Sequence, residues 1–339
     1  MGRMDELDLM MINAMQLSPR APWTELAEPL GVDASTLSRR WAQLTAGGSA
    51  WITCYVGPSQ LSWGGMALVE IGCAAGQAEE AARRIARCPH AVSVEITSGS
   101  RDLLVTVAAV TQQAVTAVVL DVLPRVFGVQ WVRTTMIVRM ARDAGSWRLD
   151  SLDPGQRRSI GEEQPETNGQ PPSLTPHREL ILALGEDGRM PYSELSHRTG
   201  VPSSTLRRRI PDLVRSGRMT IRCDTAAPEA GWPVHVSLWL DVPVGRIGDV
   251  CAGLAAMPET RMSAHVAGGA SVIAIVWLHR LEDLADWEHR VASAHPEVSV
   301  VDRAVSLRSV KRTGRLLNGA GRAVGHVPMD FWADPAPDV

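Results

Sequence analysis

The segment LAEPLGVDASTLSRRWAQLTAGG (residues 26–48) occurs a second time as LSHRTGVPSSTLRRRIPDLVRSG (residues 195–217), 169 positions later and without a gap. Ten of the 23 aligned positions are identical. The same offset pairs Ile12 with Ile181 and Gly99 with Gly268. Chance similarity does not keep one register over so long a distance. We therefore interpret the chain as two copies of one unit of about 140 residues.

The repeated segment predicts a helix-turn-helix. In the first copy, apolar residues recur at helical spacing between Met4 and Ala14, and a second short helix is expected from about Trp23 to Leu30. Gly31 then supplies the positive φ that a sharp turn between helices requires. The third helix is expected to begin near Ala34 and to end at the Gly47–Gly48 pair.

The third helix has one face for packing and one face suited to DNA. Leu37, Trp41 and Leu44 fall together and would pack on the preceding helices, whereas Ser35 and Arg39 point the other way. Serines permit close approach to DNA, and a guanidinium can bond guanine O6 and N7 together. The predicted DNA-binding residues are Ser35, Ser38, Arg39, Arg40 and Gln43 in the first copy and Ser203, Ser204, Arg207, Arg208 and Arg209 in the second. A three-helix bundle with merely solvated arginines is the alternative.

Arg40 lies nearer the buried edge of this helix, so we expect it to contact a phosphate rather than a base. The two copies also differ in charge. Residues 1–50 hold four arginines and six acids, a net charge of −2, whereas residues 174–223 hold nine arginines and five acids, a net charge of +4. Because phosphate neutralisation dominates non-specific affinity, the second copy should bind DNA more strongly. Pro211, inside its third helix, is expected to kink the C-terminal half.

After each helix-turn-helix the apolar pattern changes to β-α-β-β-α-β. In the first copy the expected elements are 66–73, 77–87, 92–97, 103–110, 112–124 and 129–140, and in the second 234–242, 245–256, 261–267, 271–278, 280–293 and 298–308. This order predicts a ferredoxin-like sandwich, and thus an α+β fold class. Such a sheet has one face without helices, and pairing with a second copy would bury it.

These patterns divide the chain into six parts. They are helix-turn-helix domains at 1–52 and 176–222, ferredoxin-like domains at 62–142 and 232–312, a linker at 143–175 and a flexible tail at 318–339. The linker is rich in Pro, Gly, Ser and Gln and lacks an apolar period. The tail contains glycines followed by PMDFWADPAPDV, and we expect it to be loosely ordered.

The composition excludes several other classes. The chain of 339 residues is 45% hydrophobic and 21% charged, as in soluble globular proteins, and its apolar runs are too short to span a bilayer. Five cysteines without a CxxC pair argue against a disulfide framework or a structural zinc site and suit the cytoplasm. The net charge of −3 means that any basic surface must be local. We predict no metal and no cofactor.

A helix-turn-helix containing GVxxSTLxRR, followed by a β-α-β-β-α-β unit with Gly-x-x-Asp between its middle strands, resembles the Lrp/AsnC (feast/famine) regulators. The resemblance implies that the second unit mediates dimerisation and binds a small effector, often an amino acid. The family's turn matches Gly99–Asp102, whereas the second copy has Gly268–Ser271 and lacks the acid. The resemblance thus implies effector-binding residues Gly99, Arg101, Asp102, Gly268 and Ser271. Alternatively, Asp102 only caps a hairpin.

Members of this family usually carry one copy of each domain, so two copies would allow the sheets to pair within one chain as a pseudo-dimer. We therefore predict a sequence-specific transcription regulator, not an enzyme, that contacts adjacent half-sites and reads an imperfect palindrome. Its expected partners are double-stranded DNA, a small effector and further copies of the chain, in a dimer or a larger assembly, without a membrane.

Two other functions stay open. Siroheme decarboxylases are similar to this architecture and work through His and Arg around a tetrapyrrole. Here the nine histidines are scattered, without an HExxH motif or a paired-carboxylate cluster, so no catalytic residue is predicted. The third possibility is an interaction module that has lost DNA binding, which the acidic first copy makes plausible for one half only.

Overall fold

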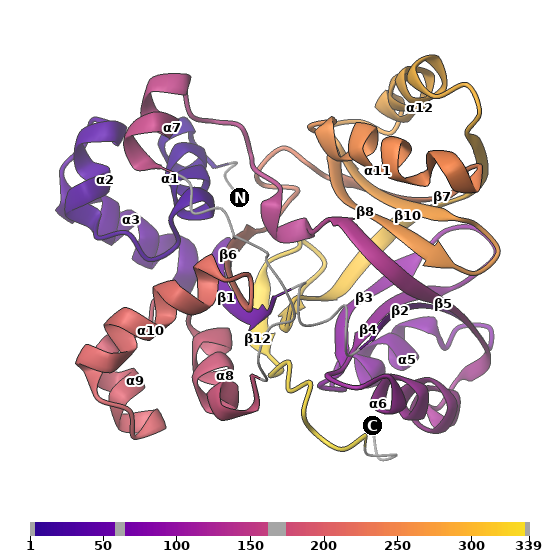
Figure 1. Cartoon of the computed structure of the whole chain (residues 1–339), viewed down its shortest axis with the longest axis horizontal. Helices are drawn as coiled ribbons and strands as arrows, with labels where there is room; N and C mark the ends of the chain where they lie inside the picture. The colour runs from indigo at the N-terminus through magenta and orange to yellow at the C-terminus, as the bar shows by residue number, and fades with distance from the viewer. Residues whose placement is uncertain (1–3, 58–64, 162–173, 336–339) are drawn as a thin grey trace.

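The computed structural model describes residues 4–57, 65–161 and 174–335. Figure 1 shows two helical units on one side of the molecule, two α/β units on the other, and the strands β1 and β6 between them. We call each helical unit a reader and each α/β unit a sensing domain. Within the described residues, no helix is long and apolar enough to cross a membrane.

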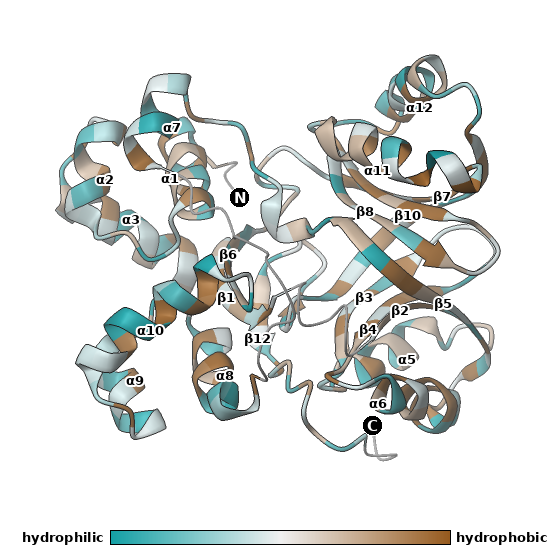
Figure 2. Cartoon of the chain, viewed as in Figure 1, coloured by the Kyte–Doolittle hydropathy of each residue, from teal (hydrophilic) through white to brown (hydrophobic). Residues whose placement is uncertain are grey.

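Each reader has three helices. They are α1 (Glu6–Leu17), α2 (Trp23–Leu30) and α3 (Ala34–Ala46) in the first reader and α8 (Arg178–Glu186), α9 (Tyr192–Thr199) and α10 (Ser203–Arg215) in the second. Asp33 caps α3 by accepting from the Thr36 amide at 2.9 Å, and Gly31 ends α2 with a φ of +68°. The helix-turn-helix prediction is confirmed. α10 continues beyond Pro211 to Arg215, and Figure 2 shows hydrophobic and hydrophilic segments side by side on α8 and α10.

A strand that we did not predict follows each reader. β1 (Ala50–Val56) and β6 (Met219–Thr225) form an antiparallel two-stranded sheet. Thr53 faces Arg222 in this pair, and these two positions are 169 residues apart. The centre of the pair therefore marks a pseudo-twofold axis between the two copies. β1 is buried at every position, so its sequence AWITCYV lacks the alternation by which a half-buried strand is identified.

The readers pack crosswise on this strand pair. Cys54 of β1 lies in the hydrophobic core of the second reader, and Cys223 of β6 lies in the core of the first. The Thr53 hydroxyl also donates to the carbonyl of Gly185 in α8 at 2.9 Å. Each reader is thus held by the strand that belongs to the other copy.

The sensing domains have the predicted β-α-β-β-α-β order. The elements are β2 (Met66–Cys73), α5 (Ala78–Ile85), β3 (Ala91–Thr97), β4 (Leu103–Ala108), α6 (Gln112–Ala117) and β5 (Val129–Arg142), then β7 (Val234–Asp241), α11 (Ile247–Ala256), β8 (Thr260–Ala267), β9 (Val272–Leu278), α12 (Asp283–Ala294) and β10 (Ser299–Arg312). A π-helical turn at Val118–Val122 extends α6. The α+β fold class is confirmed.

The two sheets join into one closed ring of eight strands. The first sheet has the order β5-β2-β4-β3 and the second β10-β7-β9-β8, and they are connected by β5–β8 and β10–β3 pairing. Leu68, Leu104, Trp239 and Ile273 are buried together inside the ring. The helix-free faces therefore bury each other within a single chain.

The segment that we predicted to be a linker is largely structured. Trp147, Leu149 and Leu152 are buried in the core of the first reader, and α7 (Pro154–Ile160) follows them. The Leu149 amide donates to the Gln16 side chain at 2.9 Å, which fixes the segment to α1. The expectation of a flexible linker is thus wrong for residues 143–161, because a few apolar side chains outweigh a polar composition. Residues 162–173 lie outside the described residues.

The tail is also ordered, against expectation. β11 (Arg315–Leu317) and β12 (Ala323–His326) extend the sheet at β10, and Phe331 is buried in the core of the second reader. The His90 ring contacts the carbonyl oxygen of Ala333 at 3.0 Å. The glycines favoured a loosely ordered tail, but the aromatic residues that follow them pack into the hydrophobic core of the second reader. Residues 336–339 lie outside the described residues.

Candidate functional site

The first recognition helix, α3, has the two faces that the sequence predicts. Leu37 and Trp41 are buried in the core of the reader. The exposed face carries Ser35, Ser38, Arg39, Ala42 and Gln43. The Ser35 hydroxyl donates to Asp33 at 2.5 Å, and this bond is the main cause that lowers the pKa of Asp33. Ser35 therefore supports the helix cap as well as facing solvent.

Arg40 is engaged within the protein rather than free for DNA. Its Nη1 lies 2.6 Å from an Asp5 carboxylate oxygen and 2.9 Å from one of Asp8. These hydrogen bonds, that to Asp5 first, raise the pKa of Arg40. The structure therefore argues against the expected phosphate contact, because two carboxylates from the start of α1 already neutralise this guanidinium.

The second recognition helix, α10, exposes Ser204, Arg207 and Arg208. Ser203 is held differently, since its hydroxyl donates to the Tyr192 carbonyl at 3.0 Å. The Arg207 guanidinium lies over the Tyr192 ring, 4.5 Å from its centroid. Arg208 is therefore the arginine most clearly presented to solvent on this helix.

Arg209, the counterpart of Arg40, has a different neighbour. The positions equivalent to Asp5 and Asp8 are Leu174 and His177. Burial, with Arg209 as the second cause, lowers the pKa of His177. The edge of the second recognition helix thus remains cationic where that of the first is neutralised, in agreement with the charge difference between the readers.

A reciprocal pair of arginines joins the readers. Arg20, between α1 and α2, donates to the carbonyls of Gly188 and Met190 at 2.5 and 3.0 Å. Its guanidinium lies 4.7 Å from the centroid of the Tyr192 ring. Arg20 of the first reader therefore binds the turn between α8 and α9 of the second reader.

Arg189, the counterpart of Arg20, makes the same contacts in the opposite direction. It donates to the carbonyls of Pro19 and Ala21, both at 3.0 Å, and lies 4.2 Å from the centroid of a Trp23 ring. Burial lowers the pKa of Arg189 to about 10. We call Arg20 and Arg189 the reciprocal arginine clamp. It fixes the two readers relative to each other.

The clamp was missed in the sequence, although a signal exists. SPRAPW (residues 18–23) and DGRMPY (residues 187–192) share an arginine, a proline and an aromatic residue at the common offset. All three lie before the segment that decides the helix-turn-helix, where identity between the copies is low.

The predicted effector turns are built into the ring. The Asp102 carboxylate accepts from the Cys73 amide at 2.7 Å, and the Ser271 hydroxyl accepts from the equivalent Val242 amide at 2.8 Å. Both side chains fasten a β-hairpin to the end of a neighbouring strand. This geometry favours the hairpin-cap interpretation of Asp102, and it explains how the second copy dispenses with the acid.

Arg101 is a contact between the two sheets. Its side chain is buried, donates to Glu70 at 2.8 Å, pairs with Asp302 and lies 4.1 Å from the centroid of the Trp239 ring. We expected Arg101 to bind an effector, but the structure commits it to this interface. Gly99 and Gly268 also lie against the opposite copy, next to the Arg303 carbonyl and the Thr135 side chain, respectively.

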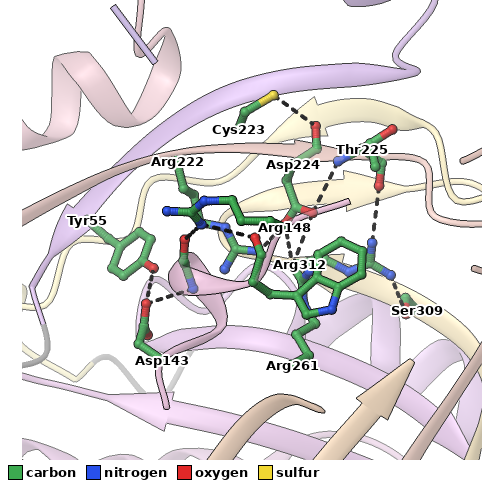
Figure 3. Close-up of polar contacts among 12 residues, drawn as sticks. Tyr55, Asp143, Arg148, Arg222, Cys223, Asp224, Thr225, Arg261, Ser309 and Arg312 are labelled. Atoms are coloured by element: carbon green, nitrogen blue, oxygen red, sulfur yellow. Dashed lines mark hydrogen bonds and ion pairs between the residues drawn. The ribbon is translucent and has the colours of Figure 1, made fainter. Parts of the chain in front are cut away.

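A cavity of about 120 Å³ lies between the strand pair and the ring. Arg222 and Arg261 line it and are bonded to the buried Asp224, at 2.9 and 3.1 Å (Figure 3). Across the cavity, the Tyr55 hydroxyl donates to Asp143 at 3.0 Å. We call this cavity the axial cavity. No sequence motif predicts it, because its walls come from strands of both copies and from the tail.

Comparison with known proteins agrees with these features. An AsnC-type helix-turn-helix domain model matches residues 4–45, a winged helix-turn-helix DNA-binding model matches residues 176–218, and an Lrp/AsnC ligand-binding domain model matches residues 66–146. An HTH-type transcriptional regulator of Pyrococcus abyssi is 32% identical over 108 residues, which cover 32% of this chain and 68% of that protein. The chain belongs to the Lrp/AsnC family of transcriptional regulators.

Within the Lrp/AsnC family, HTH-type transcriptional regulator FL11 of Pyrococcus horikoshii is 25% identical over 141 residues, which cover 41% of this chain and 93% of that protein. The curated regulator thus corresponds to about one of the two copies. The duplication accounts for the difference in length.

The match to a solved structure extends over both copies of this Lrp/AsnC chain. The siroheme decarboxylase NirDL aligns with a TM-score of 0.58 over 97% of both chains, at 14% sequence identity. At that identity the similarity is one of fold. It shows that the tandem arrangement of readers and sensing domains occurs in another protein.

Proposed function

We propose that this Lrp/AsnC chain regulates transcription by binding double-stranded DNA in a sequence-specific manner through α3 and α10, under the control of a small effector such as an amino acid. The observation that carries the proposal is the pair of recognition helices with exposed polar faces, joined by the reciprocal arginine clamp. An interaction module without DNA binding would not need either feature.

The two recognition faces differ, so the operator should be an imperfect palindrome. We infer that the exposed Arg39 and Arg208 bond guanine in the major groove, and the first face adds Gln43 where the second has Asp212. Half-sites read by paired helix-turn-helix units lie about 34 Å apart, one turn of the double helix. We propose that one chain covers both half-sites.

An effector would act by favouring one arrangement of the readers over another. It can shift that equilibrium only if it binds the two arrangements with different affinity. β1 and β6 connect the readers to the sensing domains, so a ligand that contacts either strand could have this differential effect.

The test is a pull-down of genomic DNA fragments with the purified protein at near-physiological salt, together with the Arg39→Ala/Arg208→Ala variant. We expect the wild type to enrich a shared motif and the variant to lose it, each substitution weakening binding by about 1–3 kcal/mol.

The matched control is Arg83→Ala/Arg290→Ala, which removes two partly exposed arginines from the sensing domains. It should enrich the same motif as the wild type. Equal enrichment by the wild type and the Arg39→Ala/Arg208→Ala variant would contradict the assignment of the recognition faces.

The fold shared with NirDL makes a siroheme-decarboxylase-like enzyme the second candidate. The axial cavity is smaller than the cavity of about 150 Å³ that accommodates benzene, so a tetrapyrrole would not fit it. A wider recess of about 790 Å³ lies between α1 and the second sensing domain, but Asp150, Glu259, Asp283 and Asp286 on its wall outnumber Arg148 and Arg290. A polycarboxylate would be repelled there. Absorbance titration with siroheme tests this candidate directly, and saturable binding with a shifted spectrum would favour the enzyme.

A further inference from the structure

The axial cavity lies where the two copies meet, on the pseudo-twofold axis. Its wall contains equivalent positions from both copies, including Ser93 with Met262 and Thr106 with Ile275. In a dimer of identical chains, both members of each pair would be the same residue. The duplicated chain is free of this constraint, and both of these pairs have diverged.

The divergence separates charge across the cavity. The second copy contributes Arg261 and Arg312, whose counterparts in the first copy are Val92 and Asp143. Arg222, also from the second copy, has Thr53 as its counterpart. The second copy thus contributes a cationic side, whereas the first copy contributes the hydroxyl of Tyr55, the carboxylates of Glu95 and Asp143, and Arg139.

Two of the three arginines on the cationic side are ion-paired. Arg222, Arg261 and Arg312 are 5%, 5% and 7% exposed, and Asp224 is ion-paired with the first two. Arg312 instead donates to the Thr225 carbonyl at 3.3 Å and to the Ser309 hydroxyl at 3.2 Å. Among the described residues, no carboxylate lies within ion-pair distance of Arg312.

A buried guanidinium without an ion partner is costly, because desolvation removes its favourable interaction with water. The cost appears as a lowered pKa of Arg312, caused by burial. Glu95, the other acid of the wall, reaches Arg312 only through the Ser309 hydroxyl, which donates to Glu95 at 3.5 Å, and burial raises the pKa of Glu95. An anion bound beside Arg312 would supply the missing charge.

The rest of the wall is apolar. Ile137, Met140, Met262, Trp277 and Phe331 surround the charged groups. Trp277 lies beneath both arginines, 3.7 Å from Arg261 and 4.8 Å from Arg312, measured from guanidinium carbon to ring centroid. Together with the volume, this limits the occupant to a compact apolar body bearing one anionic group.

We propose that the axial cavity binds a small aliphatic carboxylic acid, with its carboxylate against Arg312 and its short branched body against Trp277 and the methionines. This inference deepens the proposed function, since it names the chemical class of the effector. The Arg312 guanidinium also bonds to Thr225 of β6, the strand that packs on the first reader. A ligand that binds this guanidinium can therefore alter its bond to Thr225, and with it the connection between the ring and that reader.

The test is calorimetric titration of the full chain with 2-methylpropanoate and with 3-methylbutanoate. Neutral 3-methylbutanamide has the same body as 3-methylbutanoate without the charge, and L-valine has the same body and carboxylate plus an ammonium group. We expect at least one carboxylate to bind the wild type, and the amide to bind at least tenfold more weakly than 3-methylbutanoate. L-valine binding more tightly than 3-methylbutanoate would assign the zwitterion and keep the carboxylate site.

Arg312→Met removes the charge but keeps most of the side-chain volume, and it should weaken carboxylate binding at least tenfold. Arg308→Met on the same strand, which loses a half-exposed arginine paired with Glu79, should bind as the wild type does. The proposal is overturned if neither carboxylate binds the wild type, if amide and acid bind equally, or if Arg312→Met binds unchanged. The wild-type comparison with the amide decides the matter even if the variant does not fold. DNA binding measured in parallel without ligand tests the proposed function separately.

Discussion

Arg40 and Arg209 occupy equivalent positions on the two recognition helices but have different neighbours. Asp5 and Asp8 bond Arg40, whereas His177 stands near Arg209. Both acids are visible in the sequence, but their contact with Arg40 depends on how α1 crosses α3. The sequence thus predicts which residues lie on the recognition helix but not which of them are already paired.

Asp5→Asn/Asp8→Asn should increase the affinity of the protein for DNA, because Arg40 becomes available and two negative charges leave the surface. Each additional phosphate that the protein neutralises steepens the dependence of log affinity on log salt by about 0.9. Fluorescence anisotropy over a salt series measures both. The control Asp121→Asn/Asp249→Asn removes two exposed acids from the sensing helices. Equal affinity for the two double variants would contradict the role given to Arg40.

Lys311 is a second residue whose charge depends on its surroundings. It is fully buried, and its Nζ donates to the Cys88 carbonyl at 2.9 Å. Burial lowers the pKa of Lys311 to about 7, from an ordinary value of 10.5. Between those two pH values the unfolded chain binds more protons than the folded one, so this residue costs stability as the pH falls from 10.5 toward 7.

Lys311→Met should therefore stabilise the protein at pH 7, by about 1–4 kcal/mol if it behaves like other buried charges replaced by apolar residues. The stabilisation should shrink as the pH rises toward 10.5, above which the lysine is neutral in both states. Urea unfolding of the wild type and the variant, at about pH 7 and again at about pH 9.5, measures the difference. A variant less stable than the wild type at neutral pH would show that the buried ammonium is compensated.

At the scale of elements, the sequence predicts the helices and strands of both copies well, because each has a clear apolar period. It fails for β1 and β6, which are covered on both faces, and for the tail, whose aromatic residues find a core made by another domain. The reciprocal arginine clamp is the third omission. Its residues lie in turns, where no periodicity marks them.

The Arg20→Ala/Arg189→Ala variant tests the clamp. Each arginine donates two bonds to backbone carbonyls, and bonds from charged donors contribute about 1.5–3 kcal/mol each. We expect a lower melting temperature and weaker binding to DNA with two half-sites, while binding to a single half-site is retained. Arg83→Ala/Arg290→Ala again serves as control. Loss of half-site binding as well would mean that the clamp supports the fold of each reader rather than their relative placement.

At the scale of the whole molecule, the closed ring pairs two sensing domains within one chain. In a single-copy regulator these two domains would come from two chains. The repeat in the sequence predicts this possibility, and the β5–β8 and β10–β3 pairing realises it. The axial cavity could not be predicted, because its character depends on pairs of residues 169 positions apart that face each other only after the ring has closed. The turns predicted to bind the effector contact the opposite copy at this closure, and their effector binding stays a prediction.

The most direct test of two unequal readers on one chain is hydroxyl-radical footprinting of the selected operator with the wild type, Arg39→Ala and Arg208→Ala. We predict that one chain protects two different half-sites, and that each substitution removes protection from one of them. Arg208→Ala should lose more affinity, since it lies on the more cationic reader. A symmetric footprint, or loss of both half-sites to the same extent in both variants, would contradict the account.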